Sequence, residues 1–210
     1  MKTTTNKLKA AIGLIVILFL YNCSPPAHVQ RVSENSVHDL SGRWNETDSK
    51  ITGDQIGEDL LSNAWYSTFT SQNKGKQPTI IVGFIGNKSH EHIAVETFEK
   101  DIERAIINSG KMKLVQSGNM REEVRAERAD QQNNASQETV KKFGMEHGAD
   151  FMLTGTINSI VDQYSAEKTI FYQIDLELTN IQTNEKVWIG DKKIKKYLGN
   201  KKQKGNEVEN

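Results

Sequence analysis

An apolar run near the start of the chain limits the part that can fold. Three lysines, Lys2, Lys7 and Lys9, precede an apolar stretch from Ala10 to Tyr21. This stretch is shorter than the roughly 20 residues that a helix needs to cross a bilayer, and a basic start before a short apolar run is typical of a secretory signal peptide. We therefore expect residues 1–22 to be removed as a signal peptide.

Cys23 follows at the expected cleavage site and is the single cysteine of the chain. One cysteine cannot form a disulfide within the chain, so the fold must depend on its apolar core. The stretch Leu20-Tyr21-Asn22-Cys23 resembles the bacterial lipobox, although Asn22 stands where glycine or alanine is usual. We predict that Cys23 is lipidated and holds the protein on a membrane, because two or more buried acyl chains anchor a protein stably. The alternative is a membrane-embedded signal anchor with an incidental cysteine.

Composition places the rest of the chain among ordinary globular proteins. The chain has 27 basic and 27 acidic residues and a formal net charge of zero. It therefore lacks the global basic field that supports non-specific nucleic-acid binding, and we do not expect nucleic acid as a partner. The length after residue 22 suits one domain with a tether and a tail.

The expected organisation follows from shifts in composition. Residues 24–37 are polar, contain Pro25 and Pro26 and show no periodicity, which is typical of a flexible tether. If residues 24–51 were all unstructured, their full extension at about 3.3 Å per residue would reach roughly 90 Å. The boundaries that we predict are a lipidated cysteine and tether at 23–38, a globular domain at 39–197 and a polar disordered tail at 198–210.

Apolar spacing predicts helices and strands in alternation, followed by a hairpin. A helix capped by Thr52 or Asp54 should run to Phe69, and Thr79 to Ile85 should form a strand buried on both faces. Further helices are expected at 95–109, at 119–128 and at 137–148, and further strands at 112–115 and 149–161. Residues 169–179 alternate between apolar and polar side chains, and residues 186–191 should be their antiparallel partner.

These elements predict the fold class α/β (α+β). We expect a single domain with a mixed central sheet of about five strands, flanked by helices and ending in an antiparallel hairpin. The lysine-rich stretch from Lys192 to Lys204 is consistent with a basic sheet edge that resists pairing with other chains, or with a patch for an acidic partner.

The sequence shows no catalytic constellation. His90, Glu91 and His92 could in principle ligate a metal, but zinc sites need three or four ligands, so a solvated loop is the better interpretation. His147 lies on the apolar side of its expected helix and should be a packed histidine. Without a nucleophile and base pair or a phosphate loop, we expect no enzyme activity, no catalytic residue, no metal, no cofactor and no small-molecule substrate.

Residues 39–49 are the candidate binding segment. They contain too many turn-forming residues for a helix, which predicts a structured loop or short edge segment. Trp44 could cover an apolar surface of the domain while Asp39, Asn45 and Asp48 bond nearby backbone amides. Alternatively, the segment could contact a partner.

This segment, Asp39-Leu40-Ser41-Gly42-Arg43-Trp44-Asn45-Glu46-Thr47-Asp48-Ser49, resembles the signature of the LpoB family, outer-membrane lipoproteins that activate penicillin-binding proteins. The resemblance continues through Gly148-Ala149-Asp150-Phe151-Met152-Leu153-Thr154-Gly155 and the closing hairpin. It implies a domain similar to the N-terminal domain of TolB that docks on a bifunctional penicillin-binding protein and stimulates its glycosyltransferase and transpeptidase activities. It also implies an outer-membrane lipid anchor facing the periplasm and a set of partner-binding residues: Asp39, Leu40, Ser41, Gly42, Arg43, Trp44, Asn45 and Asp48. The tether here is much shorter than that of the best-known members.

Two other functions remain open from the sequence. The stretch around Asp150 is also similar to one in the curli-export lipoprotein, so a subunit of an outer-membrane secretion assembly is the main alternative. Such a subunit would need about 9–11 alternating residues for each membrane strand. Only residues 169–179 have that form, and they include Asp175 and Glu177. A small-ligand-binding or hydrolytic envelope protein would need a convergent polar pocket.

Overall fold

The computed structural model describes residues 29–33, 36–37, 39–136, 138 and 146–199. Contacts divide the chain into two units, residues 1–38 and residues 39–210. Cys23 and the predicted signal peptide lie outside the described residues, as does the predicted tail apart from Leu198 and Gly199. The described residues of the first unit are in neither helix nor strand, and Val29 and Val32 are exposed.

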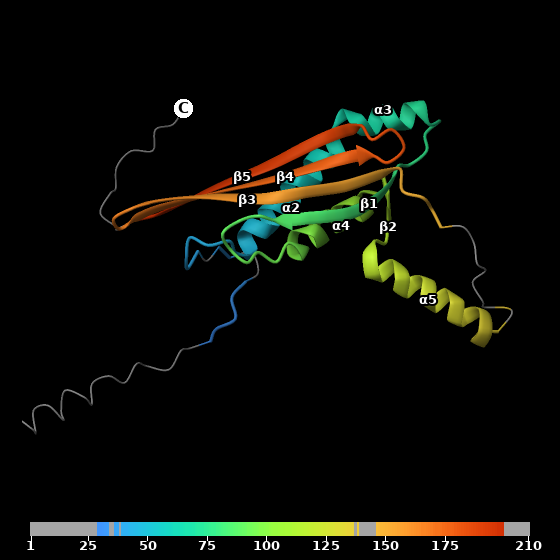
Figure 1. Ribbon diagram of the computed structural model, residues 1–210, viewed down its shortest axis with the longest axis horizontal. Coiled ribbons are helices and arrows are strands. Elements are labelled where there is room, and N and C mark those ends of the chain that lie inside the picture. The colour runs from blue at the N-terminus through green and yellow to red at the C-terminus, as the bar shows by residue number, and fades with distance from the viewer. Residues whose placement is uncertain (1–28, 34–35, 38, 137, 139–145, 200–210) are drawn as a thin grey trace, which may run out of the picture. The chain divides into compact units, whose positions relative to one another are not determined.

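Four helices and five strands of the second unit are described, and Figure 1 shows them in order. The helices are α2 (Glu46–Ser62), α3 (Ala64–Gln72), α4 (Glu96–Ser109) and α5 (Gly118–Asn134). The strands are β1 (Thr79–Asn87), β2 (Lys113–Val115), β3 (Phe151–Tyr164), β4 (Glu167–Asn180) and β5 (Lys186–Leu198).

The strands form one sheet in the order β2-β1-β3-β4-β5. β1 pairs in parallel with β2 and β3, whereas β3, β4 and β5 are antiparallel. The predicted mixed sheet of about five strands with a closing antiparallel hairpin is therefore confirmed.

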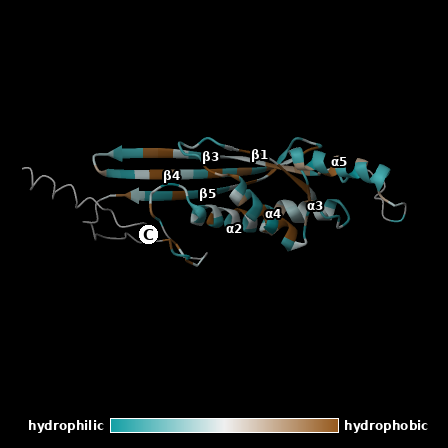
Figure 2. Ribbon diagram, turned by 90° about the horizontal axis from the view of Figure 1, so that it is seen from below, coloured by the Kyte–Doolittle hydropathy of each residue, from teal (hydrophilic) through white to brown (hydrophobic). Residues whose placement is uncertain are grey.

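The core lies between the sheet and the helices α2 and α4, which Figure 2 shows on one side of the strands. β4 supplies the clearest pattern, because its alternate residues Ile170, Tyr172, Ile174, Leu176 and Leu178 are all buried. The alternation predicted for residues 169–179 is therefore confirmed, and its physical basis is the opposite direction of successive side chains in a strand.

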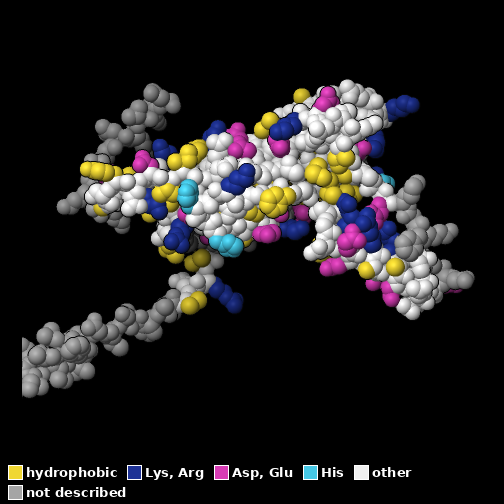
Figure 3. Space-filling model, in the orientation of Figure 1, with side chains coloured by type: hydrophobic (Ala, Val, Ile, Leu, Met, Phe, Trp, Pro, Cys, Tyr) yellow, Lys and Arg dark blue, Asp and Glu magenta, His cyan; other side chains and the backbone are white. Residues whose placement is uncertain are grey.

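The other face of the sheet is more open. Met152, Ile160, Ile189 and Tyr197 are each exposed there, at odd intervals from the buried residues of their strands. Hydrophobic side chains on the face in Figure 3 lie in small separate groups among charged side chains. This mixture is normal for a protein surface.

Two helix predictions need correction in the N-terminal half. The first helix begins at Glu46, not at Thr52 or Asp54, so the end of the expected loop at 39–49 is helical. The helix is also interrupted at Asn63, whose extended backbone (ψ 156°) separates α2 from α3. Trp65 stabilises this break, because its indole nitrogen donates to the Leu60 carbonyl over 3.0 Å.

Further corrections concern the chain after residue 128. α5 continues to Asn134 through residues that we expected to be a polar connection, and most of the helix expected at 137–148 lies outside the described residues. The described end of that helix, Glu146–Gly148, is in neither helix nor strand. His147 is exposed, so the prediction of a packed histidine is wrong.

β1 is buried on both faces only in its first part. Thr79 to Val82 are buried as predicted, but Phe84 is 82% exposed. The register with β3 shifts between Val82 and Ile85, and a β-bulge of this kind changes the direction of the side chains within it.

Candidate functional site

Residues 39–45, which we call the strap, lead into the N-terminus of α2. Asn45 is the N-cap: its side chain accepts a hydrogen bond from the Asp48 amide at 3.1 Å, and the Asp48 carboxylate accepts one from the Asn45 amide at 2.9 Å. This capping box satisfies two helix donors that would otherwise lack partners. The spacing of Asn45 and Asp48 is the sequence signal that locates the true start of α2.

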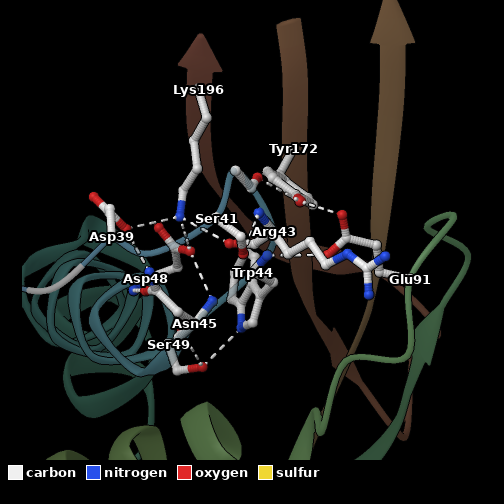
Figure 4. A network of polar contacts seen from close by, with 11 residues as sticks. Asp39, Ser41, Arg43, Trp44, Asn45, Asp48, Ser49, Glu91, Tyr172 and Lys196 are labelled. Carbon is white, nitrogen blue, oxygen red and sulfur yellow. Dashed lines mark hydrogen bonds and ion pairs between the residues drawn. The ribbon is translucent and has the colours of Figure 1, made fainter. Parts of the chain in front are cut away.

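Lys196 of β5 holds the strap to the sheet (Figure 4). Its ammonium lies 2.6 Å from Asp48 Oδ2, 3.0 Å from the Arg43 carbonyl oxygen and 3.3 Å from Asp39 Oδ1. The side chains of Lys196 and Asp48 are 12% and 7% exposed. This ion pair is largely removed from water, and the loss of one partner would leave an uncompensated charge.

Trp44 attaches the strap to the core. Its ring meets that of Tyr172 edge-on, with centroids 5.5 Å apart, and lies 6.4 Å from that of Phe98. Its indole nitrogen donates to Ser49 Oγ at 2.8 Å, while its backbone amide donates to Glu91 Oε2 at 3.0 Å. These contacts are typical of an aromatic residue that packs with its polar atom paired.

Glu91 joins the strap to β4. Its second carboxylate oxygen accepts a hydrogen bond from the Tyr172 hydroxyl at 2.8 Å. Burial, and next the hydrogen bond to Glu91, raise the pKa of Tyr172 far above its ordinary value. The phenol is therefore held protonated as a donor.

Gly42 of the strap is buried. A Cβ atom added there would overlap the Leu198 side chain. The strap consequently lies close against the end of β5, and Leu198 belongs to the packed domain although we placed it in the tail.

The structure separates the predicted partner-binding residues into two groups. Gly42, Trp44, Asn45 and Asp48 are engaged within the domain, and the packing interpretation expected this of Trp44, Asn45 and Asp48. Leu40 is 95% exposed, and Ser41 and Arg43 are also exposed. These three side chains are the part of the set that is available to a partner.

Asp39 has an intermediate position. It accepts a hydrogen bond from the Asn45 side-chain amide and not from a backbone amide as expected. That bond, and next the contact with Lys196, lower the pKa of Asp39. The carboxylate therefore orients the start of the strap.

Three residues of this network, Glu91, Tyr172 and Lys196, were not identified as site residues from the sequence. Glu91 was assigned to a solvated loop, but it is half-buried and bonded to both the strap and β4. Lys196 was assigned to a basic edge, although its place in the alternation of β5 puts it on the same side as the buried Trp188. That alternation was the available signal. His90 bonds to Ser159, and the described residues contain no group of three metal-binding side chains.

The fold and the strap define a class: a single mixed α/β domain in which an N-terminal segment is fastened to the last strands of the sheet. Comparison with protein families identifies this class more closely. The family described as peptidoglycan-synthase activator LpoB matches residues 48–194, and the chain belongs to this family. Membership implies the role of a peptidoglycan-synthase activator, which is regulatory and not enzymatic.

Solved structures similar to this chain include members of the same family. The LpoB C-terminal domain from Salmonella enterica is 16% identical, with a TM-score of 0.41, over 70% of this chain and 98% of that one. The NMR structure of E. coli LpoB is 15% identical, with a TM-score of 0.37, over 82% of this chain and 77% of that one. Lipoprotein GNA1162 from Neisseria meningitidis is 14% identical, with a TM-score of 0.34, over 57% of this chain and 83% of that one. No curated protein matches the sequence.

Within the described part of the chain, none of the helices has the length and apolar character needed to span a membrane.

Proposed function

We propose that this protein is a lipid-anchored envelope protein that binds a bifunctional penicillin-binding protein and stimulates its glycosyltransferase and transpeptidase activities. The family match over residues 48–194 is the observation that carries the proposal. Activation requires no chemistry from this protein, since a domain that binds the active conformer of the synthase more tightly shifts its population.

The exposed residues of the strap are the proposed contact. Leu40 and Arg43 project from a segment that the Lys196 ion pair and the packing of Trp44 fasten to the domain. A fastened segment loses less conformational entropy on binding than a free loop does. An apolar side chain beside an arginine also suits the centre of a protein interface, where arginine is enriched.

We further propose that the anchor is a lipid on Cys23, in the outer membrane and facing the periplasm. Because α2 begins at Glu46 and the strap is fastened from Asp39, residues 39–51 do not add to the length of the predicted tether. At about 3.3 Å per residue, residues 24–51 would span roughly 90 Å when fully extended, whereas residues 24–38 would span about 50 Å. The synthase would then have to extend to within that distance of the anchoring membrane.

The anchor is tested by the replacement Cys23→Ser. The wild-type protein should sediment with the outer-membrane fraction, whereas the variant should be recovered in the soluble fraction because it lacks buried acyl chains. A variant that remains in the membrane fraction would indicate an uncleaved signal anchor instead.

The docking proposal is tested with the purified full chain and purified bifunctional synthases from the same cell. Binding should be measured together with glycan polymerisation and crosslinking. Leu40→Asp and Arg43→Glu should each weaken binding about tenfold, which corresponds to about 1.4 kcal/mol, and should lower activation in parallel. Trp44→Ala is a poor probe of this contact because it would also remove core packing.

Matched controls are available on the same domain. Ile107→Asp and Lys74→Glu make the same chemical changes at exposed positions outside the strap. If the controls lose as much binding as the strap variants, the strap is not part of the interface. If no complex forms at tens of micromolar, the synthase is not the partner. A large assembly of this chain alone would favour the secretion-subunit alternative.

A further inference from the structure

The sheet is incomplete beside the second half of β1. β2 pairs only with Thr79, Ile80 and Ile81, and Figure 1 shows it lying beside the start of β1. Within the described part of the chain, residues 82–87 therefore have no strand on that side. A strand edge of this kind presents unpaired backbone N–H and C=O groups, which can pair with another chain.

A hollow of about 590 Å³ lies along this stretch of β1. The strand side of the hollow includes Gly83, Phe84 and Ile85, and the other side is the segment that returns from β1 to α4, with Ile93 and Val95. Ile85, Ile93 and Val95 are buried, whereas Phe84 stands 82% exposed at the bulge. The hollow thus combines apolar walls with an exposed aromatic ring.

Two carboxylates complete the wall. Glu96 and Glu99, in the first turn of α4, both line the hollow, and neither forms a salt bridge within the described residues. The nearby Lys100 instead pairs with Glu103 at 2.5 Å. Burial, and next the charge of Glu96, raise the pKa of Glu99. The negative charge at the wall is therefore not neutralised by the domain itself.

We propose that the free edge of β1 binds an extended peptide segment of a partner protein by strand addition, with a lysine or arginine of that segment against Glu96 and Glu99. Main-chain hydrogen bonds to an exposed edge give affinity in this mode of recognition, and pockets for alternate side chains give specificity. Alternate residues of an added strand point to one side, so residues i and i+2 of the peptide would both face the hollow, one apolar residue beside Phe84 and one basic residue against Glu96 and Glu99. The charge of the wall selects a basic peptide over an acidic one.

This surface shares no residue with the strap, and the inference goes beyond the proposed activation of a synthase. The two are tested separately, because peptide binding at β1 can be measured without a synthase. The result at the strap consequently does not determine the result at β1.

The test uses a capped ten-residue peptide in which every second residue is threonine and the residues between are valine and lysine in turn, so that valine and lysine share one side of the strand. It is titrated into the ¹⁵N-labelled full chain. The largest amide shifts should fall on residues 82–87. The double variant Glu96→Lys/Glu99→Lys should bind this peptide at least tenfold more weakly. It should also gain binding to the matching peptide with glutamate in place of lysine, which the wild-type protein should not bind.

The matched control is Glu58→Lys/Glu123→Lys, which changes the net charge equally at exposed helix positions. Equal weakening in this control would reduce the effect to long-range charge attraction and overturn the proposal. A peptide concentration of about 1 mM detects even weak binding. If the amides of residues 82–87 do not shift at that concentration, the proposal is overturned. Shifts in these amides on raising the protein concentration without peptide would assign the edge to a second copy of this chain, again contrary to the proposal.

Discussion

The two sides of the sheet differ in how fully their strands are paired. β3 and β4 pair along their whole length, from Phe151 with Asn180 to Tyr164 with Glu167. On the opposite side, the pairing of β1 with β2 ends after three residues. Antiparallel strands joined by tight turns acquire their register locally, whereas parallel strands depend on crossover connections that place them from a distance. The strands of the hairpin are therefore paired with each other along nearly their whole length, whereas the second half of β1 has a partner only on the β3 side.

The same two sides differ in how their charged groups are matched. The carboxylates of Asp39 and Asp48 near β5 both meet Lys196. Beside β1, Glu96 and Glu99 face a hollow without an ion-pair partner in the described residues. The Lys196 ion pairs therefore hold the strap to the domain, whereas the carboxylates beside β1 remain available to an external cation.

The largest expected effect on stability comes from breaking the ion pair between Lys196 and Asp48. Lys196→Met keeps most of the apolar stem but leaves Asp48 without its cation in a site where that carboxylate is 7% exposed. Loss of one partner of such a pair should lower the free energy of unfolding by about 3 kcal/mol, measured by urea denaturation. The control is Lys195→Met at the exposed neighbouring residue, which should change the free energy of unfolding little. Similar values for the two variants would mean that the ion pair does not hold the strap.

A smaller effect is expected from the Tyr172 hydroxyl and concerns pH. Its pKa in the folded protein is raised above the ordinary value of 10.0, chiefly by burial. The protonated phenol therefore stabilises the fold fully below about pH 10, and this contribution is lost as pH rises further. The free energy of unfolding of the wild-type protein should therefore fall as pH rises above about 10. Tyr172→Phe should reduce the slope of this fall by up to about 1.4 kcal/mol per pH unit.

The comparison for this prediction is Tyr164→Phe, because Tyr164 is 86% exposed. Denaturation curves at several pH values above 9 should separate the two variants. Parallel curves for Tyr172→Phe and the wild-type protein would contradict the role of burial.

The smallest effect on stability is expected from replacing Phe84 beside β1. Phe84 is 82% exposed beside the free edge of β1, so Phe84→Ser removes few internal contacts. The free energy of unfolding should change by less than about 0.5 kcal/mol, in the range typical of surface substitutions. Phe98→Ser, at a fully buried core position, is the contrasting variant. A large loss for Phe84→Ser would show that the ring supports the fold and is not a contact surface.

Much of the fold could be predicted because its signals are local. The alternation in residues 169–179, the turn before Lys186 and the stop of α4 at Gly110 each depend on neighbouring residues. Gly110 adopts the left-handed conformation (φ 63°) that glycine tolerates at a helix end. The prediction for the start of α2 is wrong because the turn-forming residues of segment 39–49 indicated a loop, whereas Asn45 and Asp48 form a capping box.

The candidate site was predicted only in part. The sequence indicated the strap as a candidate segment. It could not indicate which residues of the strap face outward, because their exposure depends on contacts with residues about 50 to 150 positions away. Glu91, Tyr172 and Lys196 meet the strap from a turn and two strands. Nothing near Lys196 in the sequence distinguishes it from Lys195 except its place in the alternation of β5.

The sequence by itself determined the class of fold, because hydrophobic periodicity and turn chemistry act over a few residues. It also determined where the candidate segment lies. The tertiary structure decided that Gly42, Trp44 and Asp48 serve the domain while Leu40 and Arg43 remain exposed. It also decided that β1 keeps a free edge. Both outcomes depend on which distant segments come to cover a surface, and burial of that kind is fixed only when the whole chain packs together.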